Sequence, residues 1–322
     1  MIKFKSQIEL IENEIDKYIN SLKENSLYDS VKYFLELPSK RVRPLFTLLA
    51  NSLYNSDHSF AIPAALSNEM FHNFTLLHDD IMDSSKKRRG FETVHEKWNV
   101  NQAILSGDSM LIMATEFLDF YDSKIQKDLL KLFNSTALEV CEGQQLDIEF
   151  EKKTDIDFDD YIEMITKKTS VLIASSIKMA GIINQLDSGE LDILYDIGLN
   201  LGIAFQIQDD YLDLFGEEKI IGKKVGQDVV NNKKTALHHL FVNTALEAQL
   251  SKYHDYTNIN NDDEKIEKIK SLFIESDVEK SLKKLVQEYS NNATSAIESL
   301  NPKFSKNSDL ILLSEFLLKR NY

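Results

Sequence analysis

Cysteine, proline and glycine are all scarce in this chain of 322 residues. The single cysteine, Cys141, excludes a disulfide framework and favours a reducing, cytoplasmic location. Four prolines and ten glycines favour long uninterrupted helices, because these residues break helices most strongly. A cytoplasmic protein built from long helices is therefore the first expectation.

Long apolar runs are also absent, and no stretch approaches the ~18 apolar residues of a membrane-spanning helix. The longest candidate, residues 171–183, is broken by Ser175, Ser176 and Lys178. The first residues mix charged and apolar side chains and lack the apolar core of a signal peptide. We therefore expect no stable membrane insertion.

Positive charge is in short supply, with 37 Lys and Arg residues against 52 Asp and Glu residues. The net charge of −15 argues against nucleic acid or an anionic membrane as the main partner. Hydrophobic residues make up 43% of the chain, which is ample for a sizeable core. Because no low-complexity linker divides the chain, we predict a single domain over residues 1–322.

Apolar residues recur with a helical period along nearly the whole chain, and strand-like alternation is nearly absent. Pro63 is placed to open a helix through residues 69–83, and Asp187 begins a capping box before a helix over residues 191–208. The pattern therefore predicts an all-α fold. Three segments are predicted to be loops, at residues 151–157, 216–235 and 254–264. The segment 216–235 is long and rich in Gly and Lys, which is typical of a lid or binding loop.

One acidic pattern, Asp-Asp-x-x-Asp, occurs twice with the same spacing. Its carboxylates are Asp79, Asp80, Asp83, Asp209, Asp210 and Asp213. Positions i and i+4 of a helix lie on one face, so the first and last Asp of each run point the same way. Apolar residues precede both runs. The two motifs are therefore predicted to line a polar cavity within a core.

Carboxylates gathered at low dielectric need cations to neutralise them. Oxygen ligands without Cys or His suit Mg²⁺, which is the metal we predict. A further acidic segment at residues 155–159 begins like a calcium loop. It has Asp160 and Thr166 where such a loop needs Gly and Glu, so we interpret it as an acidic loop with a helix N-cap.

Two basic clusters, residues 40–43 and 86–89, stand out in this acidic chain. Alone, each would be an ordinary solvated surface. Beside metal-binding carboxylates they are predicted to bind the phosphate oxygens of a diphosphate. His72 lies two helical turns before Asp79, which makes it a candidate phosphate contact, whereas His78 is interpreted as structural.

With these residues the chain resembles the trans-isoprenyl diphosphate synthases, also called polyprenyl synthetases, from about Pro38 to Thr235. The matching motifs are Lys40-x-x-Arg43-Pro44, Glu69-x-x-His72, Asp79-Asp80-x-x-Asp83, Arg88-Arg89-Gly90, Glu142-Gly143-Gln144-x-x-Asp147, Lys168-Thr169, Phe205-Gln206-x-x-Asp209-Asp210-x-x-Asp213, Gly222-Lys223 and Lys233-x-Thr235. Ser39 and Asn232 stand where the family usually has Gly. From these two departures we expect altered loop geometry with activity retained.

The resemblance implies an isoprenoid-synthase-type helical bundle around a central cavity, usually a homodimer. It also implies head-to-tail condensation of isopentenyl diphosphate with an allylic diphosphate, giving a short-chain trans-prenyl diphosphate. Three Mg²⁺ ions would be held by Asp79, Asp83 and Asp209, with support from Asp80, Asp210 and Asp213. The allylic diphosphate would be bound by Arg88, Lys168, Lys223 and Lys233, and isopentenyl diphosphate by Lys40, Arg43, His72 and Arg89.

Charge on the departing diphosphate must be stabilised, which metal ions and Arg do best in a dry site. The backbone carbonyls of Lys168 and Thr169 and the Gln206 amide are candidates to surround the allylic cation. The departed diphosphate can itself take the proton, so no side-chain base is required.

Phe74 and Phe71, five and eight residues before the first motif, are candidates for the floor beneath the growing product. With an aromatic residue five positions before the motif, the chain resembles those family members whose product has twenty carbons. A product of fifteen carbons is the second expectation.

Two other functions are weighed against this one. A class I terpene cyclase shares the helical fold and the first motif, but its second metal site normally mixes Asn, Ser or Thr, and Glu. A non-catalytic subunit of a heteromeric prenyl synthase usually loses both motifs. The second Asp motif, together with Lys40, Arg43 and His72, favours the synthase.

Overall fold

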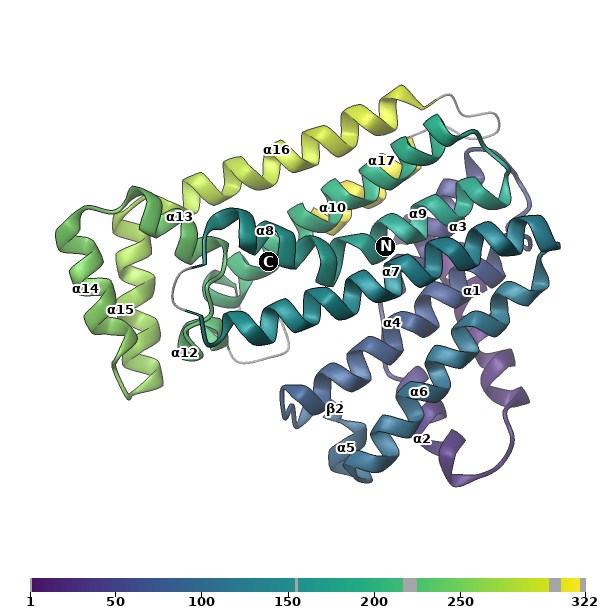
Figure 1. Ribbon diagram of the computed structural model, residues 1–322, viewed down its shortest axis with the longest axis horizontal. Coiled ribbons are helices and arrows are strands. Elements are labelled where there is room, and N and C mark those ends of the chain that lie inside the picture. The colour runs from purple at the N-terminus through teal and green to yellow at the C-terminus, as the bar shows by residue number, and fades with distance from the viewer. Residues whose placement is uncertain (1, 154–155, 217–224, 301–307, 319–322) are drawn as a thin grey trace. The chain divides into compact units, whose positions relative to one another are not determined.

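The computed structural model describes residues 2–153, 156–216, 225–300 and 308–318, and nearly all the elements in these ranges are helices (Figure 1). The predicted all-α fold is confirmed. The chain divides into two compact units. Unit 1 comprises Met1–Thr136, Leu172–Tyr195 and Ser299–Leu313, and unit 2 comprises Ala137–Val171, Asp196–Glu298 and Ser314–Tyr322. The single domain expected over residues 1–322 stays a prediction.

Unit 1 is organised around one long helix, α4. Its elements are η1 (Ile2–Phe4), α1 (Lys5–Ser21), α2 (Ser26–Leu35), α3 (Val42–Ser52), α4 (Ile62–Met82), β1 (Lys87–Arg88), β2 (Phe91–Glu92), α5 (Val94–Lys97), α6 (Val100–Glu116) and η2 (Phe117–Phe120). Helix α4 packs against α3 and α6, and α6 lies beside it in Figure 1. Pro63 occupies the first turn of α4, as predicted. Burial of Leu66, Met70 and Phe71 fixes which face of α4 points inward.

Among the described residues, five helices have residues in both units: α7 (Ser123–Phe150), α9 (Val171–Ile183), α10 (Ser188–Phe215), α16 (Val278–Ser299) and α17 (Ser308–Leu318). Unit 2 also contains α8 (Phe158–Ile165), the π-helical turn η3 (Thr166–Ser170), α12 (Gln227–Val230), α13 (Ala236–Thr244), α14 (Glu247–Thr257) and α15 (Asp262–Glu275). The core of unit 2 includes Tyr161, Ile207, Phe241, Leu272 and Leu282.

Asp side chains cap the N-termini of α8 and α10. The Asp157 carboxylate accepts a hydrogen bond from the Asp160 backbone N–H at 2.8 Å, and Asp160 reciprocates, so the interpretation as a helix cap is confirmed. The Asp187 carboxylate accepts from the Glu190 N–H at 3.0 Å at the start of α10. Helix α10 runs to Phe215 and carries the whole second Asp motif, so the prediction that these carboxylates lie on one helix is confirmed.

One hairpin was missed by the sequence prediction. Strands β1 and β2 pair antiparallel, and Arg89 and Gly90 form the turn between them with φ of 54° and 86°. Two consecutive positive φ angles are what a two-residue hairpin turn of this kind requires. Strands of two residues are too short to show an alternating pattern.

The predicted loops are only partly correct. Residues 254–257 belong to α14 and α15 begins at Asp262, so the loop expected over residues 254–264 is confined to residues 258–261. These helix ends are polar on nearly every face, so periodicity could not reveal them. Residues 217–224 of the expected lid lie outside the described residues, and α12 forms part of the remainder.

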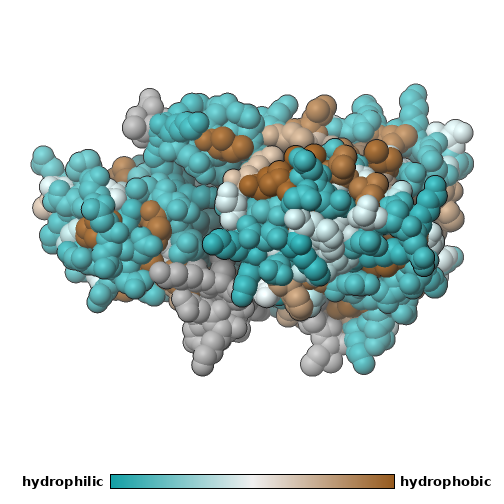
Figure 2. Space-filling model, turned by 90° about the horizontal axis from the view of Figure 1, so that it is seen from below, coloured by the Kyte–Doolittle hydropathy of each residue, from teal (hydrophilic) through white to brown (hydrophobic). Residues whose placement is uncertain are grey.

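The surface is mostly hydrophilic on the face drawn in Figure 2, with hydrophobic residues gathered in a few places. Large hydrophobic side chains exposed at the surface include Ile112 on α6, Leu138 on α7 and Leu246 before α14. None of the helices in the described residues combines the length and the apolar character that a membrane span requires.

Candidate active site

The first Asp motif occupies the C-terminal turn of α4. Asp79 and Asp80 lie in the last helical turn and Asp83 is the C-cap, whose N–H donates to the Asp79 carbonyl at 2.9 Å. The side chains of Asp79 and Asp83 are therefore one turn apart on the same side. A helix C-terminus carries partial negative charge, which is unfavourable for carboxylates. This arrangement favours a cation at the end of α4.

Asp80 and Arg88 form an ion pair behind that turn. Arg88 Nε and Nη2 both lie 2.7 Å from Asp80 Oδ1, and Nη2 lies 3.7 Å from Asp79 Oδ2. Burial raises the pKa of Asp80 to about 6, although the charge of Arg88 opposes the shift. Asp80 Oδ2 is buried and accepts no hydrogen bond from the described residues. Asp80 thus holds Arg88 beside the more exposed Asp79.

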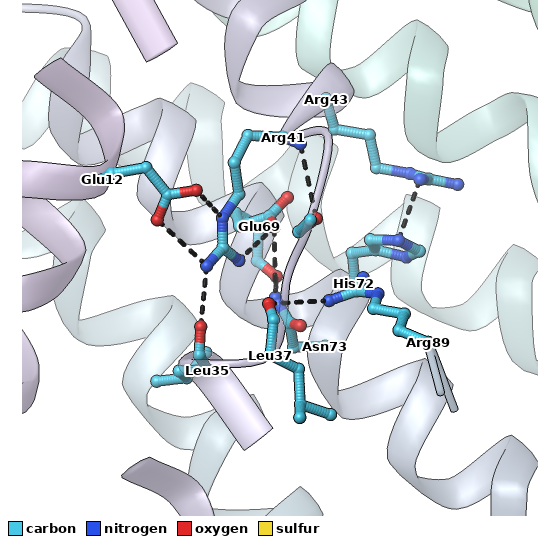
Figure 3. Close-up of polar contacts among 10 residues, drawn as sticks. Glu12, Leu35, Leu37, Arg41, Arg43, Glu69, His72, Asn73 and Arg89 are labelled. Carbon is cyan, nitrogen blue, oxygen red and sulfur yellow. Dashed lines mark hydrogen bonds and ion pairs between the residues drawn. The ribbon is translucent and has the colours of Figure 1, made fainter. Parts of the chain in front are cut away.

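Apart from this ion pair, unit 1 contains a cationic cluster around Arg43 and His72. Arg43 stands in the first turn of α3, and its Nη1 lies 3.0 Å from His72 Nε2 on α4 (Figure 3). Burial lowers the pKa of Arg43 to about 10 and the pKa of His72 well below 6.5. His72 is therefore neutral at pH 7, and its Nε2 accepts a hydrogen bond from the Arg43 guanidinium. Arg89 lies next to the pair, with Nη1 3.5 Å from the Leu37 carbonyl, while Lys40 is exposed.

Arg41 was not singled out from the sequence, although it is the most buried cation of this cluster. It is 2% exposed, and Nη1 lies 2.8 Å from Glu69 Oε1 while Nε lies 2.9 Å from Glu12 Oε1. Three cations within four positions give no periodic signal that tells which one is buried. Glu69 is a signal that a buried cation is present, because a Glu on an otherwise apolar helix face needs a cation as its partner.

The second Asp motif is held from behind by neutral donors of unit 2. Asp210 Oδ2 accepts from the Tyr161 hydroxyl at 2.7 Å and the Ala236 N–H at 2.9 Å, and Gln206 Nε2 donates to Oδ1 at 3.2 Å. Burial raises the pKa of Asp210 to about 7, and the charge of Asp228 adds to this. Asp213 is also buried and accepts from the Asp228 N–H at 3.0 Å.

Lys168 projects from the π-helical turn η3 towards α7. Its Nζ lies 2.6 Å from Asp147 Oδ2, and Lys233 Nζ lies 3.9 Å from the same oxygen. Burial alone would raise the pKa of Asp147, but the two lysines lower it below its ordinary value. The neighbouring Thr169 hydroxyl donates to Gln206 Oε1 at 3.0 Å. A π-turn widens a helix locally and is frequent at functional sites.

These side chains meet around a cavity of about 110 Å³ in unit 2. Residues that line it include Asp147, Lys168, Thr169, Gln206, Asp210 and Lys233. The structure therefore brings together five residues that the sequence singled out for the site, and adds Asp147 as the shared anion. Lys223, predicted for the same substrate, lies outside the described residues.

The donor sets of both units fit Mg²⁺. Each motif offers carboxylate oxygens on one helical turn, and unit 1 holds a buried carboxylate oxygen, Asp80 Oδ2, with no donor among the described residues. Within those residues no three Asp, Glu, His or Cys side chains form a ready-made metal cage. The predicted ligands Asp79, Asp83 and Asp209 come from both units and stay a prediction.

Phe74 and Phe71 lie on α4 before the first motif. Phe71 is fully buried, and its ring centroid lies 5.5 Å from that of Phe74 and 5.4 Å from that of Phe133. Phe74 is half-buried and also contacts the ring of His78 at 4.8 Å. Their role in setting product length stays a prediction.

Comparison with known proteins assigns the class. The all-helical structure superimposes on a crystal structure of a geranylgeranyl pyrophosphate synthase with a TM-score of 0.94 and 40% identity over 99% of both chains. It matches the geranylgeranyl pyrophosphate synthetase of Pyrococcus horikoshii Ot3 with a TM-score of 0.89 and 34% identity over 99% of this chain and 98% of that one. The fold is thus that of prenyl synthases.

The family follows from the sequence. Residues 24–275 match the family model of the polyprenyl synthetases, and the chain belongs to this family. It is a prenyltransferase that acts by trans-prenyl transfer. It is 34% identical over 99% of its length to the geranylgeranyl pyrophosphate synthase of Geoglobus acetivorans, of which 98% is covered. It is also 37% identical, over 74% of this chain and 72% of the relative, to a short chain isoprenyl diphosphate synthase of Methanocaldococcus jannaschii. The family uses Mg²⁺ to bind diphosphates.

Proposed function

We propose that the protein condenses isopentenyl diphosphate head to tail with an allylic diphosphate and releases mainly geranylgeranyl diphosphate. The observation that carries the proposal is the layout of α4. At His72 this helix contacts the guanidinium of Arg43 from α3, and seven residues later it carries a turn of carboxylates beginning at Asp79. Seven residues span about 10 Å of helix. Two diphosphates could therefore bind along one helix, the first directly to cations and the second through metal ions.

The roles of the carboxylates follow from their burial. Asp79, Asp83 and Asp209 are the more accessible members of the motifs and are proposed to hold three Mg²⁺ ions. Asp80, Asp210 and Asp213 are buried and are proposed to orient the ligands from behind. When bound, Mg²⁺ would neutralise and polarise the departing diphosphate. Residues proposed to contact the allylic diphosphate are Arg88, Lys168, Lys223 and Lys233.

The isopentenyl diphosphate site is proposed at Lys40, Arg43, His72 and Arg89. A neutral His72 suits this role, because an imidazole that accepts from Arg43 through Nε2 has its Nδ1 proton available to donate. The Thr169–Gln206 hydrogen bond and the carbonyls of η3 are proposed to surround the allylic cation without offering a nucleophile. Water must be excluded while the new C–C bond forms.

Product length and assembly are finer parts of the proposal. Relatives named geranylgeranyl diphosphate synthase, such as that of Methanosarcina mazei at 35% identity, support a twenty-carbon product. Ile104, Leu105 and Ile112 are exposed on α6 and support a homodimer. The single cysteine supports a cytoplasmic location. Light scattering of the purified protein would test the dimer.

One incubation tests the reaction. Purified protein is mixed with Mg²⁺, radiolabelled isopentenyl diphosphate and each allylic diphosphate in turn. Chain growth supports the proposal. A cyclised hydrocarbon without isopentenyl uptake would identify a cyclase, and no product would identify a non-catalytic subunit.

Substitution of Asp79 by Ala should lower turnover by about three orders of magnitude or more with the fold intact. The matched control is Asp16→Ala, an exposed Asp within α1, which should leave turnover unchanged. Near-normal turnover in Asp79→Ala would refute the assignment.

A further inference from the structure

Arg41 is enclosed by its protein neighbours, which accept hydrogen bonds from four of its five guanidinium N–H groups. Its guanidinium donates to Glu12 Oε1 and Oε2 at 2.9 and 3.2 Å, to Glu69 Oε1 at 2.8 Å and to the Leu35 carbonyl at 2.7 Å (Figure 3). It is 2% exposed. A charged group so enclosed acts on its neighbours and cannot reach a substrate.

The backbone of Arg41 is also held in an unusual conformation. Its φ of 46° is left-handed, and a non-glycine residue adopts this region at a cost of about 1 kcal/mol. Arg41 is the N-cap of α3, so this conformation sets the direction in which the first turn, with Arg43, begins. The Arg41 N–H donates to the Ser39 hydroxyl at 3.3 Å. Ser39, which stands where the family usually has Gly, thus helps to hold the turn.

The other end of the contact lies on α4 beside His72. Glu69 is 2% exposed and stands three residues before His72, one helical turn away. Its carboxylate also accepts from Asn73 Nδ2 at 3.3 Å, which limits the rotamers it can adopt. The Arg41–Glu69 ion pair therefore links the start of α3 to α4 within one turn of the 3.0 Å contact between Arg43 and His72.

We propose that Arg41 is a positioning residue. It fixes the separation of Arg43 and His72 and thereby sets how tightly this site binds isopentenyl diphosphate. The proposal rests on the proposed function, which assigns these two side chains to that diphosphate. Arg, with its planar fork, can hold Glu12 and Glu69 at once, whereas Lys offers one point charge. Displacement of a binding group by about 1 Å can cost up to about 100-fold in catalysis.

The test separates the two substrates. Wild type and Arg41→Lys are assayed with isopentenyl diphosphate varied at saturating allylic diphosphate, and then the reverse. The expected result is a rise of at least about tenfold in the KM for isopentenyl diphosphate, with the KM for the allylic diphosphate within about twofold of wild type. Lys17→Met, which removes an exposed ion pair with Glu14, is the control and should change neither KM.

A second variant, Arg41→Met with Glu69→Gln, guards against a mere loss of fold. It removes the buried charge of Glu69 together with that of Arg41, so it should unfold closer to wild type than Arg41→Met alone. The KM for isopentenyl diphosphate should nevertheless stay raised, because the link to α4 is still missing. If that KM returned to the wild-type value with stability, or if both KM values rose equally, the positioning role would be overturned. If wild type itself consumed no isopentenyl diphosphate, the proposed function would fail first.

Discussion

Gly143 offers the sharpest test of how rigidly the site is held. It lies in α7 where this helix meets η3, and a Cβ added there would stand 2.2 Å from the Lys168 backbone nitrogen and 2.7 Å from the Lys167 carbonyl carbon. Ordinary contacts of a Cβ are about 3.5 Å or longer. Both neighbours are backbone atoms, so a Gly143→Ala variant must displace the turn that carries Lys168 and Thr169 by about 1 Å.

The expected magnitudes follow from two opposing terms. Ala is favoured over Gly within a helix by about 1 kcal/mol. Overpacking of a tight contact costs about 1–3 kcal/mol, so the net change in the free energy of unfolding should be small, about 0–2 kcal/mol of destabilisation. Turnover should fall further, by about 10- to 100-fold, because the displaced turn carries groups proposed to face the reacting carbon.

Urea unfolding and steady-state turnover measure the two quantities on the same preparations. Two glycine-to-alanine controls match the substitution. In Gly181→Ala the added Cβ meets the ends of the Leu191 and Leu194 side chains, at 2.6 and 2.7 Å, so stability should change and turnover should not. In Gly189→Ala it meets one Asp187 oxygen at 3.2 Å, so neither should change much. Normal turnover in Gly143→Ala would refute the argument that a fixed η3 is needed.

Three further predictions concern single side chains. Phe74→Ala should lengthen the products, because it removes the half-buried ring proposed as the floor, and an unchanged chromatographic profile would exclude that role. Tyr161→Phe removes a hydrogen bond to the Asp210 carboxylate worth about 1.5–3 kcal/mol, which should raise the pKa of Asp210 further above its ordinary value. Activity should then fall at pH 7 and recover towards pH 9, and an unshifted pH–rate profile would contradict this. For His72, whose pKa is lowered by burial, the unfolded state binds more protons than the folded state below about pH 6.5. Its contribution to the free energy of unfolding is therefore present above that pH and lost on acidification, so His72→Gln should show a shallower decline in urea midpoint between pH 7 and 5.5.

The positions of the helices and motifs could be predicted because they depend on local spacing. Asp79 and Asp83 are one turn apart in any α-helix, and the apolar residues around them show that the helix is buried. The site within unit 2 could be recognised only in part. Lys168 and Asp147 are 21 residues apart, and no local pattern pairs them.

The contacts behind the motifs could not be predicted for the same reason. The hydrogen bond between Tyr161 and Asp210 joins residues 49 positions apart, and the role of Arg41 depends on a φ angle that its sequence neighbours do not dictate. The tight approach at Gly143 likewise depends on how α7 meets η3. Such features follow from tertiary packing, which overrides local preference.

The hairpin turn after α4 has a consequence for engineering this enzyme. Arg89 adopts φ of 54° beside Gly90, where Asn followed by Gly would suit the backbone better. Arg89→Asn should therefore relieve roughly 1 kcal/mol of conformational cost and make the protein harder to unfold. The substitution would also remove a guanidinium proposed to bind isopentenyl diphosphate. Selection for heat resistance alone would drift towards Asn at this position and yield a sturdier but poorer catalyst, so screens for robust variants should score product formation as well as survival.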